Sequence, residues 1–369
     1  MKELVRECLA ALKELKLRAK ISNFKSTVNQ IGLIKVIIES SAPTRVDLAG
    51  GTVDIWPLYL FHPGAMTVNF ALSLRAHVRI DTRDDDRLIL ESRDRDIRFE
   101  TTLGRMHELA RDEELELVSK MVHFFRPEAG FHLTTHSEAP AGAGISGSSA
   151  LAIALIGALN NLVGNRYEKR QFIGIAANIE TTVIKVPAGL QDYYPAFYGS
   201  TSCIHLDPDG VEREHLAIDE NEIERRFVIC YTGEPRHSGI NNWEVFKRHI
   251  DGDADVFAIF ESIRDAAVQM RAALLANDWN AVGETMRAAY PNRKRLAPGI
   301  TTPHMDQLVE KALANGAQAA KVCGAGGGGC IAFLCKEGRK ADIERALTET
   351  GGEILKWGVA REGLVVKES

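Results

Sequence analysis

The stretch from Ala139 to Leu159, APAGAGISGSSALAIALIGAL, limits the possible folds of this chain more than any other segment. Its first half is rich in glycine and serine, and it continues without interruption into an apolar run that favours a helix. The first N–H groups of a helix have no partner within it, and they carry the positive end of the helix dipole. Glycines let a loop wrap closely around a ligand, so the stretch predicts an anion site, in the first place for phosphate.

Two common nucleotide-binding patterns can be compared with this stretch. Walker A requires a Gly-Lys pair, which the sequence lacks. The dinucleotide pattern G-x-G-x-x-G is present as Gly142, Gly144 and Gly147, with Glu168 about twenty residues further on. An NAD-binding oxidoreductase is therefore an alternative, although Pro140 before the first glycine weighs against it. A loop that only caps a helix is the other alternative.

Composition excludes several classes of protein. The chain has 369 residues, enough for two domains. Its formal net charge is −5, from 45 basic and 50 acidic residues, so a basic surface for nucleic acid is not predicted. Six scattered cysteines without a C-x-x-C pair predict buried free thiols. Charges interrupt the leucines of the N-terminus, and no apolar run has the length of a membrane span, so we expect a cytoplasmic protein that binds no membrane.

Apolar patterns predict strands and helices that intermix along the chain. The predicted strands cover residues 33–40, 76–83, 87–94, 130–138 and 226–233, and residues 319–336 are predicted as strand, glycine loop and strand. The strands 76–83 and 87–94 alternate like the two halves of a hairpin. The predicted helices cover about 147–163, 169–183, 254–290 and 303–316, and residues 186–200 are turn-rich. Because there is no strict βαβ alternation, the predicted fold class is α+β.

The predicted domain organisation has three parts. The first twenty residues have an amphipathic pattern and predict a helical N-terminal extension, residues 1–32. A polar stretch at 206–225 predicts a domain boundary there. The N-terminal domain, 33–215, then holds the glycine-rich stretch, and the C-terminal domain is 216–369.

Three further clusters accompany the glycine-rich stretch. SAPTRVDLAGGTVDIWPLY places Arg45 and Asp54 on either side of a Gly50–Gly51 turn. VPAGLQDYY places Asp192 in a second turn, and CGAGGGGC is another glycine-dense loop. Each cluster alone could have a purely structural role, but their combination in this order is a far more specific indication of function.

In these motifs the chain resembles the GHMP kinases, the superfamily of galactokinase, homoserine kinase, mevalonate kinase and phosphomevalonate kinase. APTRVDLAGGTVD, PAGAGISGSSAL and KVCGAGGGGCIAF are similar to its three motifs in order, and the resemblance covers the chain from about residue 38 onward. AGLQDYYPAFYG, YTGEPRHSGI and RLAPGITTPHMDQL are similar to the sugar-1-kinase branch, which includes heptose 7-phosphate kinases. The chain departs from that branch at Val53 and at Ser146. It also departs at Tyr193, the one of these three positions at which the branch has glutamine.

The resemblance implies a two-domain fold with the active site in the cleft between the domains, and ATP with Mg²⁺ as cofactors. It implies nucleotide contacts from Pro140, Gly142, Gly144, Ser146, Gly147, Ser148 and Ser149. Ser148 and Glu180 are the implied Mg²⁺ ligands, although a surface charge is the alternative for Glu180. Asp192 is the implied catalytic base, and Arg45 is expected to steady it or to contact the transferred phosphoryl group.

The implied substrate is a sugar or sugar phosphate, phosphorylated at its anomeric hydroxyl by a monomer or homodimer. The implied substrate contacts are Asp54, Gly51, Gln191, Arg236, Ser238, Gly326 and Gly327. Arg236 and Ser238 are either a second anion site or part of a solvated loop. The alternatives are a galactokinase-like or mevalonate-kinase-like enzyme acting on another small alcohol, and a nucleotide sensor without turnover. His132 and His136 share one strand face without a third ligand nearby in sequence, so a structural or surface role is predicted for them.

Overall fold

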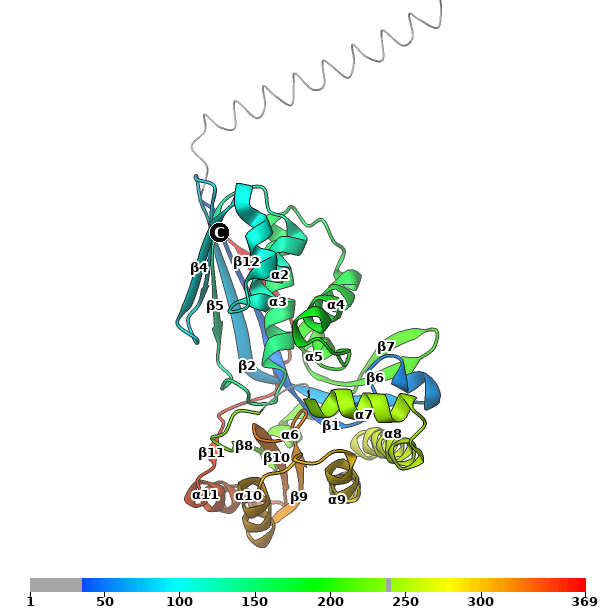
Figure 1. Ribbon diagram of the computed structural model, residues 1–369. Coiled ribbons are helices and arrows are strands. Elements are labelled where there is room, and N and C mark those ends of the chain that lie inside the picture. Colours follow the sequence, from blue (N-terminus) through cyan, green and yellow to red (C-terminus); the bar gives the residue numbers. More distant parts are fainter. Residues whose placement is uncertain (1–34, 237–239) are drawn as a thin grey trace, which may run out of the picture.

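The computed structural model describes residues 35–236 and 240–369 (Figure 1). The predicted helix at 1–20, the predicted extension 1–32 and Ser238 therefore lie outside the described residues. The strands are β1 (Ile37–Ala49), β2 (Met66–Thr82), β3 (Arg87–Ser92), β4 (Ile97–Thr102), β5 (Phe131–Ser137), β6 (Thr201–Asp207), β7 (Gly210–His215), β8 (Phe227–Tyr231), β9 (Ala317–Val322), β10 (Cys330–Cys335), β11 (Glu353–Ile354) and β12 (Val365–Glu368).

The helices connect these strands in both halves of the chain. The α-helices are α2 (Glu116–Phe125), α3 (Gly147–Leu162), α4 (Phe172–Ile184), α5 (Tyr193–Tyr198), α6 (Glu220–Arg226), α7 (Ile240–Ile250), α8 (Ala254–Leu275), α9 (Trp279–Leu296), α10 (Pro303–Ala314) and α11 (Lys340–Glu349). The 3₁₀-helices are η1 (Leu58–Phe61), η2 (Leu103–Arg111) and η3 (Lys169–Gln171). Among the described residues, no helix has the length and apolar character needed to cross a membrane.

The larger sheet has the strand order β12-β1-β2-β5-β3-β4, and β6 and β7 continue it from β2. Its strand pairs are antiparallel except for β3 with β5. Helix α3 packs on β1 and β2, flanked by α2 and α4, and it is buried along nearly its whole length (Figure 1). This mixed arrangement confirms the predicted α+β class, since a doubly wound dinucleotide fold has a mostly parallel sheet.

The predicted hairpin of residues 76–83 and 87–94 is wrong. Both segments are strands, β2 and β3, but β5 lies between them in the sheet. Arg79 of β2 pairs with Thr134 of β5, and Ile89 of β3 pairs with His132 of β5. Alternation of apolar and polar residues shows that a strand has one solvated face, but it carries no information about the neighbouring strand.

The smaller sheet has the order β11-β8-β10-β9 and is entirely antiparallel. Helices α10 and α11 pack beside it (Figure 1). The predicted strand–loop–strand at 319–336 is confirmed as β9 and β10. The predicted helix at 303–316 is confirmed as α10, in which Pro303 occupies the first turn and the Thr302 side chain accepts a hydrogen bond from the Met305 N–H.

The last strand connects the two halves of the chain. β12 pairs with β1, so that Glu368 lies opposite Ile38 at the edge of the larger sheet. The division of the chain after residue 215 stays a prediction, and β12, which follows residue 215, pairs with β1, which precedes it. The turn-rich stretch 186–200 also contains the short helix α5, which begins directly after Asp192.

Five of the six cysteines and two of the histidines have the roles that the sequence predicts, whereas Cys8 lies outside the described residues. The five cysteines of the described residues are buried free thiols, namely Cys203, Cys230, Cys323, Cys330 and Cys335. His132 contacts Glu91 at 2.9 Å and His136 contacts Asp94 at 2.6 Å, and both are partly exposed on the larger sheet. A structural or surface role for these two histidines is therefore confirmed.

Candidate active site

One cavity collects side chains from both halves of the chain. The end of β1 and the turn after it supply Asp47, Gly51, Thr52 and Asp54, and the start of α3 supplies Ser148 and Ser149. Glu180 of α4 and the α4–α5 loop form another wall. Arg236, Arg293 of α9, and Gly324 with Ala325 of the β9–β10 loop complete it from the C-terminal half. Motifs that are far apart in the sequence thus meet at one place.

The phosphate-loop candidate connects β5 to α3. Ser146 lies directly before the helix with φ of 63°, and its buried hydroxyl has no hydrogen-bond partner among the described residues. Gly147 begins the helix, and a Cβ atom placed on it would meet no described atom within 4 Å. The start of α3 therefore has open space beside Gly147, where the first N–H groups of the helix can bind a phosphate.

Gly142 and Gly144 serve a different purpose from Gly147. Their φ values are 67° and 77°, where side chains are strained. A Cβ atom on Gly144 would lie 2.8 Å from the carbonyl oxygen of Cys323, and one on Gly142 would lie 2.6 Å from Pro235. These two glycines therefore allow the loop to pack against segments of the C-terminal half.

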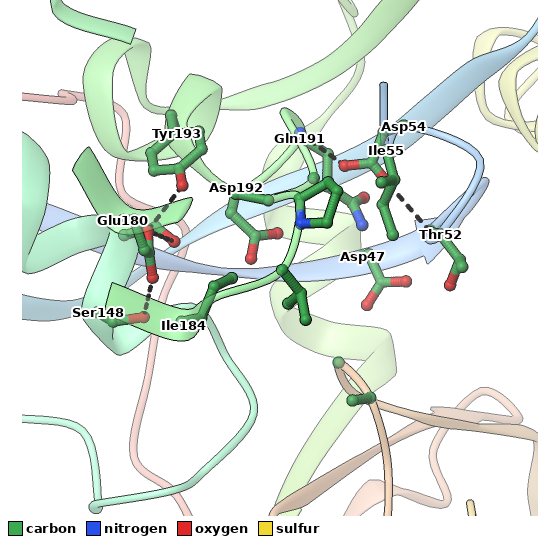
Figure 2. Close-up of a pocket in the computed structure, with 18 of the residues that line it drawn as sticks. Asp47, Thr52, Asp54, Ile55, Ser148, Glu180, Ile184, Gln191, Asp192 and Tyr193 are labelled. Carbon is green, nitrogen blue, oxygen red and sulfur yellow. Dashed lines mark hydrogen bonds between the residues drawn. The ribbon is translucent and has the colours of Figure 1, made fainter. Parts of the chain in front are cut away.

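Glu180 is the centre of a group of hydroxyl donors (Figure 2). Its carboxylate accepts hydrogen bonds from Ser148 at 2.5 Å, from Ser149 at 3.0 Å and from the Tyr193 hydroxyl at 2.7 Å. Burial raises the pKa of Glu180 above its ordinary value, although these hydrogen bonds oppose the rise. Carboxylate and hydroxyl oxygens are the ligands that Mg²⁺ prefers, so the Ser148–Glu180 pair fits the expected ion.

Sequence reasoning missed the contact of Tyr193 with Glu180. The only signal was that Tyr193 follows Asp192 where the sugar-1-kinase branch has glutamine. Tyr193 is fully buried at the start of α5, and its ring directs the hydroxyl toward α4 (Figure 2). The departure from the branch pattern therefore lies at the Ser148–Glu180 end of the cavity.

Asp192 and Arg45 form an ion pair in the middle of the cavity. The Nε and Nη2 atoms of Arg45 lie 2.9 and 2.5 Å from Oδ1 of Asp192, so both bonds go to one carboxylate oxygen. The Arg45 side chain is buried, whereas that of Asp192 is 25% exposed. Burial opposes the charge of Arg45, but the carboxylates of Asp192 and Asp47 raise its pKa above the ordinary value. The predicted contact between Arg45 and Asp192 is thus present, with the second oxygen of Asp192 outside it.

Asp47 and Lys321 extend this pair into a row of alternating charges. Asp47 lies 3.6 Å from Nη1 of Arg45 and 2.7 Å from Nζ of Lys321. Burial acts to raise the pKa of Asp47, but Lys321 and Arg45 hold it well below its usual range. Sequence reasoning missed Asp47, although it is two residues from Arg45 on the same strand and so points to the same face.

Asp54 and Gln191 form the opposite end of the cavity from Glu180, with Asp192 between the two ends (Figure 2). The Asp54 carboxylate accepts hydrogen bonds from the N–H groups of Thr52 at 3.0 Å and Gln191 at 2.9 Å. Burial, together with the charge of Asp192, raises the pKa of Asp54 to about 6. The side-chain oxygen of Gln191 is buried without a hydrogen-bond partner among the described residues. Asp54 thus holds the loop through two backbone N–H groups.

The glycine-dense loop contributes less to the cavity than the sequence predicts. Gly324 lines the cavity. Gly326 and Gly327 instead pack against Gly299 and Ile300, where a Cβ atom on Gly326 would lie 2.4 Å from the Ile300 carbonyl oxygen. The substrate contacts expected from Gly326 and Gly327 stay a prediction, because the close contact with Ile300 already explains why position 326 requires glycine.

Comparison with known proteins agrees with this geometry. Two family models match the chain, "GHMP kinases N terminal domain" over residues 116–200 and "GHMP kinases C terminal" over residues 270–353. The chain belongs to the GHMP kinases. The first match contains the phosphate loop and Asp192, and the second contains Arg293 and the glycine-dense loop. This GHMP kinase is therefore an ATP-dependent enzyme, and the oxidoreductase alternative is wrong.

Similar proteins span nearly the whole chain. The D-glycero-α-D-manno-heptose 7-phosphate kinase of Campylobacter jejuni is 25% identical over 336 residues, covering 89% of this chain and 98% of its own length. The mevalonate kinase of Pyrococcus furiosus is 26% identical, covering 91% and 99%. The crystal structure of a D-glycero-D-manno-heptose 1-phosphate kinase from Bacteroides thetaiotaomicron has a TM-score of 0.71 at 23% identity, covering 89% and 98%. The last comparison supports the fold.

Proposed function

We propose that this GHMP kinase transfers the γ-phosphoryl group of ATP to a sugar or sugar phosphate, with an anomeric hydroxyl as the acceptor. The observation that carries the proposal is the position of Asp192, between the Ser148–Glu180 end and the Asp54–Gln191 end of one cavity. The similarity to the heptose 7-phosphate kinase of Campylobacter jejuni supports a sugar phosphate as the acceptor.

The nucleotide end of the cavity is formed by the start of α3. Its first N–H groups and the unpaired Ser146 hydroxyl bind the ATP phosphates, since they are the unsatisfied donors of the helix. Ser148 and Glu180 would hold Mg²⁺, which supplies charge neutralisation of the phosphates when it is bound. Tyr193 keeps the Glu180 carboxylate in place through its hydroxyl.

Asp192 is the proposed base for phosphoryl transfer. The acceptor oxygen forms a bond to the γ-phosphorus while the bond from that phosphorus to the β–γ bridging oxygen breaks. The hydroxyl proton moves to the Asp192 carboxylate. Arg45 fixes Oδ1 of Asp192 with two hydrogen bonds, so Oδ2 is left to receive this proton. Asp47 keeps the buried guanidinium of Arg45 partnered from its other side.

The acceptor binds at the end of the cavity formed by Gly51, Asp54 and Gln191. A Cβ atom on Gly51 would lie 2.6 Å from the Asp47 carboxylate, so the backbone of Gly51 lies directly beside that carboxylate. The unpaired Gln191 amide oxygen can accept a hydrogen bond from a sugar hydroxyl. Arg236 lines the same cavity, which supports the first of its two predicted roles, a contact with an anion.

The proposal is tested by a screen of acceptors in which ATP-dependent ADP release is measured. The panel contains D-glycero-D-manno-heptose 7-phosphate, the same heptose without phosphate, D-galactose and mevalonate. Heptose 7-phosphate is expected to be the best acceptor, with the product phosphorylated at the anomeric position by NMR. Preference for mevalonate would replace the sugar by another small alcohol. ATP binding without ADP release on any acceptor would favour the nucleotide sensor.

A further inference from the structure

The cavity holds two arginines, Arg236 and Arg293, that have no ion-pair partner among the described residues. Four cations lie in or directly beside it, namely Arg45, Arg236, Arg293 and Lys321. Arg45 is paired with Asp192, and Lys321 is paired with Asp47. Within residues 35–236 and 240–369, neither Arg236 nor Arg293 has a carboxylate at ion-pair distance.

Arg293 is held in position by neutral groups. Its Nη1 donates to the Thr52 hydroxyl at 2.7 Å, and its Nη2 donates to the carbonyl oxygen of Gly324 at 2.9 Å. A guanidinium has five N–H donors, so three of them have no hydrogen-bond partner among the described residues. Burial lowers the pKa of Arg293, the carboxylates of Asp47 and Asp54 oppose this fall, and the charge of Arg236 adds to it. A desolvated cation of this kind is costly unless an anion joins it.

The two arginines flank the same residue, Gly324. Arg236 approaches it so closely that a Cβ atom there would lie 2.5 Å from Nη1 of Arg236. Arg236 also contacts the phosphate loop, since its Cδ lies 3.3 Å from the Cβ position of Gly144. Arg293 instead contacts Thr52, whose N–H is bound by Asp54 at the acceptor end. Arg236 is thus nearer to the nucleotide, and Arg293 is nearer to the acceptor.

We infer that Arg293 is a specificity residue that binds an anionic group of the acceptor beside Gly324, with Arg236 on the other side of that group. This inference rests on the proposed function and names the chemical class of its substrate, an acceptor that carries a phosphate or carboxylate. Arginine suits this role because its planar fork binds two oxygens of such a group at once. A neutral acceptor would leave both guanidinium groups without an anion at ion-pair distance.

The test compares Arg293→Gln with the wild type on the same panel of acceptors. The change is expected to lower kcat/KM for heptose 7-phosphate by about 10- to 100-fold, the scale of a charge-assisted hydrogen bond, mainly through KM. The KM for ATP and kcat/KM for the unphosphorylated heptose should change by less than about threefold. Arg293→Lys should recover part of the loss, because it restores the charge without the fork.

Lys294→Gln is the matched control, because it removes a positive charge one residue further along α9. Lys294 is 40% exposed and pairs with Asp306 at 2.9 Å, outside the cavity, so its loss should leave all the kinetic constants unchanged. Equal loss on phosphorylated and unphosphorylated heptose in Arg293→Gln would make Arg293 a structural clamp and overturn the inference. Wild-type preference for a neutral acceptor would also overturn it.

The same experiment separates the inference from the proposed function. If mevalonate is the acceptor, the sugar kinase proposal fails, but the role of Arg293 stands when Arg293→Gln raises the KM for mevalonate and not for ATP. If heptose 7-phosphate is the acceptor and Arg293→Gln leaves its KM unchanged, the sugar kinase proposal stands and the role of Arg293 fails.

Discussion

Replacement of Asp192 by Asn tests the centre of the proposed mechanism. Asn keeps the shape of the side chain and an oxygen at the Oδ1 position, which can still accept from Arg45, but it cannot take a proton. Loss of a general base lowers turnover by about 10²- to 10⁴-fold. In free energy this is roughly 3 to 5 kcal/mol of transition-state stabilisation.

The change also affects the ion pair with Arg45. Removal of one partner from a fully buried pair costs about 3 to 5 kcal/mol of stability. Asp192 is 25% exposed, and Arg45 also keeps the Asp47 carboxylate at 3.6 Å. We therefore expect a loss nearer to that of one charged hydrogen bond, about 1.5 to 3 kcal/mol. The variant should remain folded.

Three measurements on the same preparation distinguish these effects. Steady-state ADP release gives kcat, titration calorimetry gives the ATP affinity, and denaturant unfolding gives the stability. The expected result is a large loss of kcat, an ATP affinity within about threefold of the wild type, and a modest loss of stability. Asp265→Asn, on the exposed side of α8 and paired with Arg264 at 2.8 Å, is the control. Turnover of Asp192→Asn within a few-fold of the wild type would refute the assignment of Asp192 as the base.

Three further predictions concern the ends of the cavity. Gly147→Ala should weaken ATP binding in calorimetry and leave Tm nearly unchanged, because its Cβ meets only open space. Gly144→Ala should instead lower Tm, because its Cβ meets the Cys323 carbonyl oxygen. A lower Tm for Gly147→Ala would contradict the phosphate-binding role of Gly147. Tyr193→Phe removes a hydrogen bond to Glu180, so the Mg²⁺ concentration for half-maximal activity should rise by about tenfold. An unchanged Mg²⁺ requirement would show that Tyr193 does not support Mg²⁺ binding at Glu180. The pKa of Asp54 is raised from 3.8 to about 6 in the folded protein, so ionisation of Asp54 disfavours folding. The free energy of unfolding should therefore fall as pH rises from about 4 to 6. In denaturant unfolding, Asp54→Asn should lack this contribution to the pH dependence.

The sequence determined the local parts of this protein. The apolar run after Ser149 favours a helix, and it forms the buried helix α3. The glycine-dense loop between two apolar strands, and the helix that begins at Pro303, were also predictable, because each depends on residues that are neighbours in the chain. The order of the motifs predicted the kinase family, and with it the positions of Asp192 and Glu180.

Only the tertiary structure decided which residues meet. Strand β5 enters between β2 and β3, and β12 returns to β1, because these pairings depend on the packing of the whole sheet. The same holds for Arg293, which lies 241 residues from its hydrogen-bond partner Thr52. Gly144 could be recognised as a glycine that a loop requires, but the Cys323 carbonyl that requires it belongs to the other half of the chain. Sequence patterns describe short-range geometry, whereas the charge balance of a cavity arises from side chains that the fold brings together.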